Sequence, residues 1–180
     1  TNISIRALEA SRGPYIASHA LYIGTSNGKV FRLNDPRNAP ANTSPVDITP
    51  PELEDLRTQG APVNISDIAV NPNNDEEIMV VVSNYTATTN AGTANDFNIW
   101  WTNNAKSTTP VWRKAEGNLT LPSIRSCMIV VKKDGNTSVT EYYVGTSVGL
   151  YSAVNIGATL QAGNDVNWVR EGGNVLNFAV

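Results

Sequence analysis

The sequence contains a single cysteine, Cys127, in 180 residues, so no internal disulfide can form and cysteine usage does not indicate a redox compartment. Charged residues make up only 16% of the chain, below the roughly one quarter of an average domain. No apolar run approaches the roughly 18 residues of a membrane span. The net charge is −3 and no basic stripe is present, so we expect no nucleic-acid partner and no membrane span.

The first residues show no initiator Met and no signal-peptide pattern, so we expect a piece excised or processed from something longer. Few charges beside abundant Asn and Thr are typical of secreted all-β proteins.

A repeated segment is the most informative feature that the sequence does contain. Residues 20–28 and 141–149 are β-rich runs that both close on Gly-Thr-Ser-x-Gly, and residues 77–85 are a degenerate third copy. Aligned on Tyr22, Met79 and Tyr143, the copies lie 57 and 64 residues apart. Self-similarity at such a period indicates a stacked or radial array of structural units.

Each copy lies within the same succession of four short β-runs. The first run alternates apolar and polar residues, at 3–8, 63–70 and 124–131. Turn signals at 71–75 and 132–136 indicate hairpins into the second run, which is the repeated segment. The third runs are 30–33, 97–101 and 150–153, and the fourth are 46–48, 111–114 and 166–170.

Four antiparallel strands in about 60 residues match one blade of a β-propeller. We therefore predict an all-β propeller segment of about three four-stranded blades. The blades are expected at residues 1–58, 59–118 and 119–174, and residues 175–180 as the first strand of a fourth. Other blades, from the parent protein or another chain, would complete the ring.

Helix is nearly absent. Residues 49–57 are the one good candidate, with Thr49 as N-cap and Pro in the first turn. We expect this helix and the low-complexity loop 86–95 to lie on the same rim of the propeller. Because propeller loops commonly carry binding, residues 50–57 and 86–97 are the expected contact surface.

Several of these segments resemble a known group of proteins. Residues 63–74, residues 143–151 and the recurring Trp112 and Trp168 are similar to bacterial neuraminidase (Asp-box) repeat propellers. That superfamily includes sortilin-type receptors, xyloglucanases and many secreted bacterial proteins. The likeness is strongest to large secreted bacterial propeller proteins of unknown activity that often end in a sorting domain, which implies an extracellular or cell-surface location. No Asp box is intact, although Ser152, Gly157 and Thr159 keep its outline.

Two arginines stand at one repeat position near the start of the first strands, Arg6 and Arg125, with Ser66 at the same position between them. The resemblance implies that inward-facing arginines could clamp a carboxylate, as they do in sialidases, and the forked guanidinium suits that task. Sialidase chemistry also needs a Tyr nucleophile, and none lies on a first strand. We therefore take Arg6 and Arg125 as binding candidates only.

Asp67 is the one candidate for catalysis. The resemblance to xyloglucanase-like propellers would place an acid there, but glycoside hydrolysis needs a second carboxylate roughly 5–10 Å away. The equivalent residues are Ala7 and Ser126, and Glu9, the only other acid on a first strand, lies further along. The expected role of Asp67 is to accept hydrogen bonds from backbone amides of a turn.

The Trp100-Trp101 pair lies on a strand, where neighbouring side chains point to opposite faces. One ring should pack between blades while the other is exposed or packs elsewhere, and an exposed Trp101 could stack on a sugar. Trp112 and Trp168 should pack between blades.

We expect no cofactor and no metal. His19 has no ligand at suitable spacing. Residues 75–77 could offer Ca²⁺ hard oxygens but are more simply a solvated acidic turn. Cys127 aligns with Leu8 and Ile68 and should be a buried thiol.

The sequence thus predicts a non-catalytic binding or scaffolding module of a secreted propeller protein, with a protein or glycan as its ligand. The alternative is part of a propeller glycoside hydrolase whose site other blades complete.

Overall fold

A computed structural model of the chain describes residues 2–60, 63–83, 98–119 and 123–172, and within them twelve strands form three four-stranded antiparallel sheets. Sheet A contains β1 (Ile5–Ala10), β2 (Ala20–Thr25), β3 (Val30–Asn34) and β4 (Val46–Asp47). Sheet B contains β5 (Ile65–Asn71), β6 (Asn74–Val82), β7 (Ile99–Thr102) and β8 (Arg113–Lys114). Sheet C contains β9 (Ile124–Asp134), β10 (Thr137–Thr146), β11 (Gly149–Val154) and β12 (Val169–Arg170).

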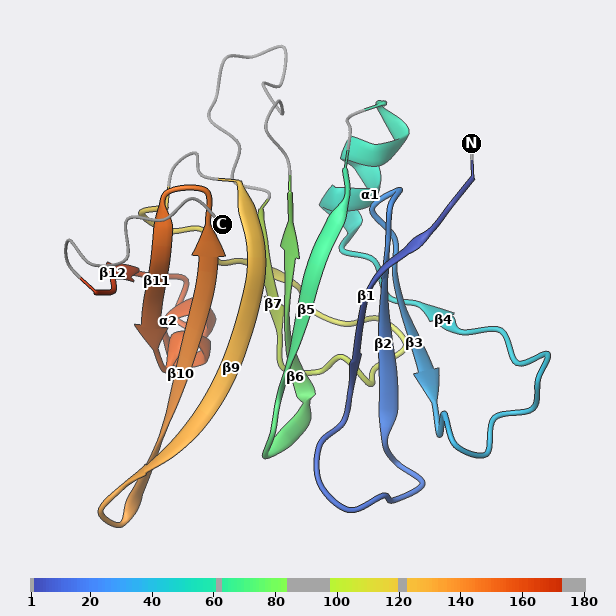
Figure 1. Cartoon of the computed structure of the whole chain (residues 1–180), viewed down its shortest axis with the longest axis horizontal. Helices are drawn as coiled ribbons and strands as arrows, with labels where there is room; N and C mark the ends of the chain where they lie inside the picture. The colour runs from blue at the N-terminus through green and yellow to red at the C-terminus, as the bar shows by residue number, and fades with distance from the viewer. Residues whose placement is uncertain (1, 61–62, 84–97, 120–122, 173–180) are drawn as a thin grey trace.

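Each strand pairs with the next strand in the chain, so each sheet is an up-and-down meander. The all-β class and the four-stranded units predicted from the repeat are confirmed, and the arrangement is consistent with a propeller-like segment. The three sheets stand side by side, with sheet B between sheet A and sheet C (Figure 1). The strands of each sheet fall within residues 1–58, 59–118 and 119–174 respectively.

The repeat alignment agrees with the strand register. Tyr22, Met79 and Tyr143 pair with the equivalent residues Glu9, Ala69 and Met128 of the first strands. Three sequence positions that look alike therefore occupy one structural position.

The Gly-Thr-Ser-x-Gly motif forms the turn after the second strand. Gly28 and Gly149 have φ of 79° and 135°, a region that glycine enters at little steric cost. The hydroxyls of Thr25 and Thr146 close the turns on the carbonyl oxygens of Lys29 and Gly149, at 3.0 and 2.8 Å.

Two apolar cores hold the sheets together, one between sheets A and B and the other between sheets B and C. Alternation along β7 sends Trp100 into the first core and Trp101 into the second, and each residue is only 2% exposed. Burying a side chain of this size contributes on the order of 3 kcal/mol. Sheet B is thus covered on both faces, by a different neighbour on each.

Trp112 and Trp168 make the same contact in successive sheets. Trp112 Nε1 donates to the carbonyl oxygen of Ile48, and Trp168 Nε1 donates to that of Ala115, both at 2.8 Å. Ile48 and Ala115 directly follow β4 and β8, so each indole bonds the outer edge of the preceding sheet. The prediction that these tryptophans pack between repeat units is confirmed.

The described residues form two helices, one between sheets A and B and the other between β11 and β12 of sheet C. The predicted helix is α1 (Pro51–Thr58), which begins later than expected, because Pro50 is its N-cap. Thr49 instead accepts a hydrogen bond from the backbone amide of Val30 at 3.0 Å, which extends sheet A by one rung. Helix α2 (Ile156–Gln161) contains Gly157 and Thr159, two of the three residues that keep the outline of an Asp box.

Residues 175–180, expected to begin a fourth blade, and the loop 86–95 lie outside the described residues. Within the described part, no helix is long and apolar enough to cross a membrane.

Candidate functional site

The first strand of every sheet carries a β-bulge at the same repeat position. The register shifts between Ile5 and Ala7 in β1, between Ile65 and Asp67 in β5, and between Ile124 and Ser126 in β9. The extra residues are Arg6, Ser66 and Arg125. A bulge re-aims a side chain and is often found next to binding sites.

These three residues line one cavity of about 430 Å³, together with Asn64, Ile65 and Ser83. The Ser66 hydroxyl lies 2.9 Å from the carbonyl oxygen of Ile124 and 3.1 Å from that of Val81, so it joins β5 to β9. The side chains of Arg6 and Arg125 are exposed. The strand register confirms that the three positions are equivalent. They lie near the starts of β1, β5 and β9, and these strands start at the end of the sheets that carries α1 (Figure 1).

Asn64 is the residue of this cavity that sequence reasoning missed. Its Oδ1 atom is buried and has no hydrogen-bond partner among the described residues. The sequence signal was available, because Asn64 directly precedes the first strand beside the repeated Arg/Ser position. The cavity therefore combines two guanidinium groups with the polar side chains of Asn64, Ser66 and Ser83.

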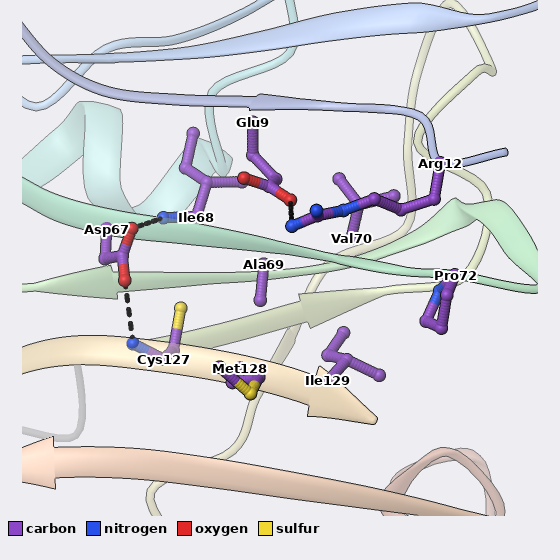
Figure 2. Close-up of a pocket in the computed structure, with 10 residues that line it drawn as sticks. All are labelled: Glu9, Arg12, Asp67, Ile68, Ala69, Val70, Pro72, Cys127, Met128 and Ile129. Carbon is purple, nitrogen blue, oxygen red and sulfur yellow. Dashed lines mark hydrogen bonds and ion pairs between the residues drawn. The ribbon is translucent and has the colours of Figure 1, made fainter. Parts of the chain in front are cut away.

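Asp67 points from β5 toward β9 (Figure 2). Its Oδ2 atom accepts the backbone amide of Cys127 at 2.9 Å, and its Oδ1 atom accepts the amide of Ile68 at the same distance. The prediction that Asp67 accepts hydrogen bonds from backbone amides is confirmed. The expected location in a turn is wrong, because one amide belongs to the neighbouring sheet and the carboxylate bridges sheets B and C.

A second cavity of about 520 Å³ lies beside Asp67 and is also lined by Glu9 (Figure 2). Glu9 forms an ion pair with Arg12, which lies just after the end of β1. Two carboxylates thus line one cavity, but each already holds a partner.

Cys127 borders the same cavity and is partly buried, as its alignment with Ile68 suggested. Burial raises the pKa of its thiol well above the ordinary value, and the charges of Asp67 and Glu9 add to the effect. Its Sγ atom lies 3.7 Å from the carbonyl oxygen of Met79. A thiol with a raised pKa is a poor nucleophile, so this cysteine is a packing residue.

Trp101 does not present its ring to solvent. It is 2% exposed, and its Nε1 atom donates to Glu77 Oε1 at 2.9 Å. Only its edge borders a cavity of about 440 Å³. Of the two alternatives for the Trp100-Trp101 pair, exposure or packing elsewhere, the second is the one observed, and stacking of Trp101 on a sugar is not supported.

Glu77 was expected in a solvated acidic turn, and this is wrong. The turn closes earlier, between Asn71 and Asn74, so Glu77 is part of β6 and is only 9% exposed. Its carboxylate accepts hydrogen bonds from Asn71 Nδ2 at 2.7 Å, from Trp101 Nε1 and from the Tyr142 hydroxyl. Burial, followed by the contact with Glu77, raises the pKa of Tyr142.

The other proposed ligand groups are held by the protein. Asp75 pairs with Lys106 at 2.5 Å and accepts the Ser11 hydroxyl. His19 contacts the edge of the Tyr15 ring. Within the described ranges, no three His, Cys, Asp or Glu side chains are grouped to hold a metal ion.

Comparison with known proteins adds one structural likeness. No model of a protein family matches the chain, and no curated protein matches it. A solved structure, described as the crystal structure of BBS1N in complex with ARL6DN soaked with lead, is 16% identical with a TM-score of 0.36. The match covers 84% of this chain and 48% of that one, so the chain spans about half the length of the structure it resembles.

Proposed function

We propose that the three sheets are blades of a β-propeller and that the chain is a non-catalytic binding or scaffolding module. Its ligand is a protein or a glycan, held at the end of the sheets that carries α1. The observation that supports this most is the cavity lined by Arg6, Ser66 and Arg125. The same bulge in three sheets brings these residues to one place, where side chains from separate repeat units can contact one ligand.

The chemistry of this cavity favours an anionic group on the ligand. Guanidinium groups bind carboxylates and sulfates through paired, charge-assisted hydrogen bonds. The neighbouring polar side chains of Ser66, Asn64 and Ser83 line the same cavity and favour a ligand that also carries hydroxyl or amide groups. An acidic sugar or an acidic peptide supplies both kinds of group. Residues 50–57, most of which belong to α1, would provide further contacts.

The scarcity of charge and the resemblance to secreted bacterial propellers support an extracellular or cell-surface location in a bacterium.

A binding screen tests this proposal. The purified chain is applied to arrays of acidic and neutral oligosaccharides and acidic peptides, and the hits are titrated by calorimetry. Replacing Arg6 and Arg125 together by Gln should weaken binding at least about tenfold, since each charge-assisted bond is worth about 1.5–3 kcal/mol. Lys133→Gln, which removes a charge at the other end of β9, is the matched control. Equal binding by the double variant and the control would refute the proposed site.

A glycoside hydrolase is the second candidate, because Glu9 and Asp67 line one cavity. Asp67, however, holds two backbone amides and Glu9 holds Arg12, so neither carboxylate is placed to serve as a free acid or base. A screen of polysaccharides with the chain and with Glu9→Gln decides between the two. Turnover that Glu9→Gln abolishes would support the hydrolase and contradict the binding module.

A further inference from the structure

Sheet A has an apolar face that neither of the other two sheets in the described part of the chain covers. This front face, turned away from sheet B, consists of Ile5, Leu8, Leu21, Ile23 and Phe31. Ile5 is 60% and Leu8 56% exposed, and the other three are half-buried. An apolar face of several large side chains indicates an interaction surface.

The repeat shows what covers this face elsewhere in the molecule. The residues equivalent to Ile5 are Ile65 and Ile124, which are 0% and 1% exposed. In both cases the preceding sheet covers them. Gly24 of sheet A makes room for Ile65, since a Cβ atom on Gly24 would lie 2.4 Å from Ile65 Cγ2. The same residue type at the same position is thus buried twice and exposed once.

Sheet C carries the complementary surface. Its rear face, turned away from sheet B, includes Met128, Tyr143, Gly145 and Leu150. Gly145 is the equivalent of Gly24, and Tyr143 is the equivalent of Tyr22, which packs between sheets A and B. Met128 is 57% exposed. The described chain therefore has one front face and one rear face that remain uncovered.

We propose that a second copy of this chain covers both faces. The front face of sheet A in one copy packs on the rear face of sheet C in the other, and the reciprocal contact closes a ring of two chains. Each contact repeats the packing of A on B and of B on C, with Ile5 seated at Gly145 as Ile65 is seated at Gly24. A head-to-tail contact of this kind closes into a ring when the rotations of its units add up to a full turn, which for six sheets means about 60° per sheet. Two chains of three sheets fall within the four to eight blades of known propellers.

The mass of the chain in solution tests this inference independently of any ligand. Light scattering at about 100 µM should give twice the monomer mass of 19.3 kDa. Leu8→Asp and Met128→Asp should each give monomers, with dissociation constants raised at least about 100-fold, because an unpaired charge would be buried in both contacts. Both side chains are more than half exposed within one chain, so these variants should fold, which circular dichroism verifies.

Mixing the two variants distinguishes the proposed contact from the alternatives. One contact of the mixed pair has wild-type residues on both sides, so the mixture should recover dimers where each variant alone is monomeric. Val111→Asp, an equally exposed apolar residue before β8, should leave the dimer intact. The inference fails if the wild-type chain is monomeric, if Met128→Asp remains dimeric, if the mixture stays monomeric, or if the mass grows beyond the dimer with concentration.

Discussion

Replacing Glu77 tests a buried carboxylate that accepts three hydrogen bonds in the core. Its carboxylate holds the end of β5 through Asn71, β7 through Trp101 and the neighbouring sheet through Tyr142. Glu77→Ala would leave three buried donors without an acceptor. A buried donor left unsatisfied costs about 1–3 kcal/mol, and part of this is recovered if water enters the adjoining cavity, so we expect a loss of about 3–5 kcal/mol.

Glu77→Gln is the finer perturbation. Its amide oxygen can still accept from Trp101 and Tyr142, but its NH₂ group then faces the Asn71 amide, which also donates. Asn71 cannot turn over without losing the bond from the backbone amide of Asn73 to its Oδ1 atom. One hydrogen bond is therefore lost, and we expect a cost of about 1–2 kcal/mol.

The assay is urea unfolding followed by far-UV circular dichroism, with the slope on denaturant checked for constancy. The neighbouring Glu76 is exposed, so Glu76→Ala is the matched control and should change stability by less than about 0.5 kcal/mol. If Glu77→Ala were no more destabilising than Glu76→Ala, the account of the core between sheets B and C would be wrong.

Two further predictions follow from the helix and the outer strands. Hydrogen bonds from an arginine and a lysine lower the pKa of Glu54 to about 2 from 4.5, so its stabilisation is complete above pH 4.5 and is lost as the pH falls toward 2. Glu54→Gln should flatten this part of the melting temperature profile, and a profile identical to wild type would contradict the ion-pair assignment. Trp168→Phe should cost about 1 kcal/mol for the lost indole hydrogen bond, and Trp112→Phe should cost a similar amount in urea unfolding. If only one of the two variants were destabilised, Trp112 and Trp168 would not make equivalent contacts.

The repeat made most of the fold predictable from sequence. A period near 60 residues aligned Ile5, Ile65 and Ile124, and strand pairing then followed from alternation and turn residues. The bulge positions Arg6, Ser66 and Arg125 were predicted to be equivalent for the same reason. Local patterns sufficed here because each sheet pairs only consecutive strands.

Contacts between sheets could not be predicted in the same way. The partner of Asp67 is a backbone amide about 60 residues away, and only the packing of β5 on β9 identifies it. Glu77 was misplaced because three acids in a row resemble a turn. Glu77 shares a strand face with Met79 and Val81, so the alternation of side chains along the strand already predicted that Glu77 points into the core. Helix α2 is short and begins after Asn155, whose φ is 48°. Its sequence has no apolar pattern of helical period from which the helix could be predicted.

The free energy of unfolding of Asp67 variants tests most directly whether this carboxylate holds the fold together or is free for catalysis. If Asp67 bridges two sheets through backbone amides, Asp67→Ala should lose about 2–3 kcal/mol, and Asp67→Asn, which keeps one acceptor oxygen, about half as much. Urea unfolding of both variants beside the wild type gives these values. Unchanged stability in Asp67→Ala would show that the carboxylate is not committed to the fold, and would contradict its assignment as a bridge between sheets B and C.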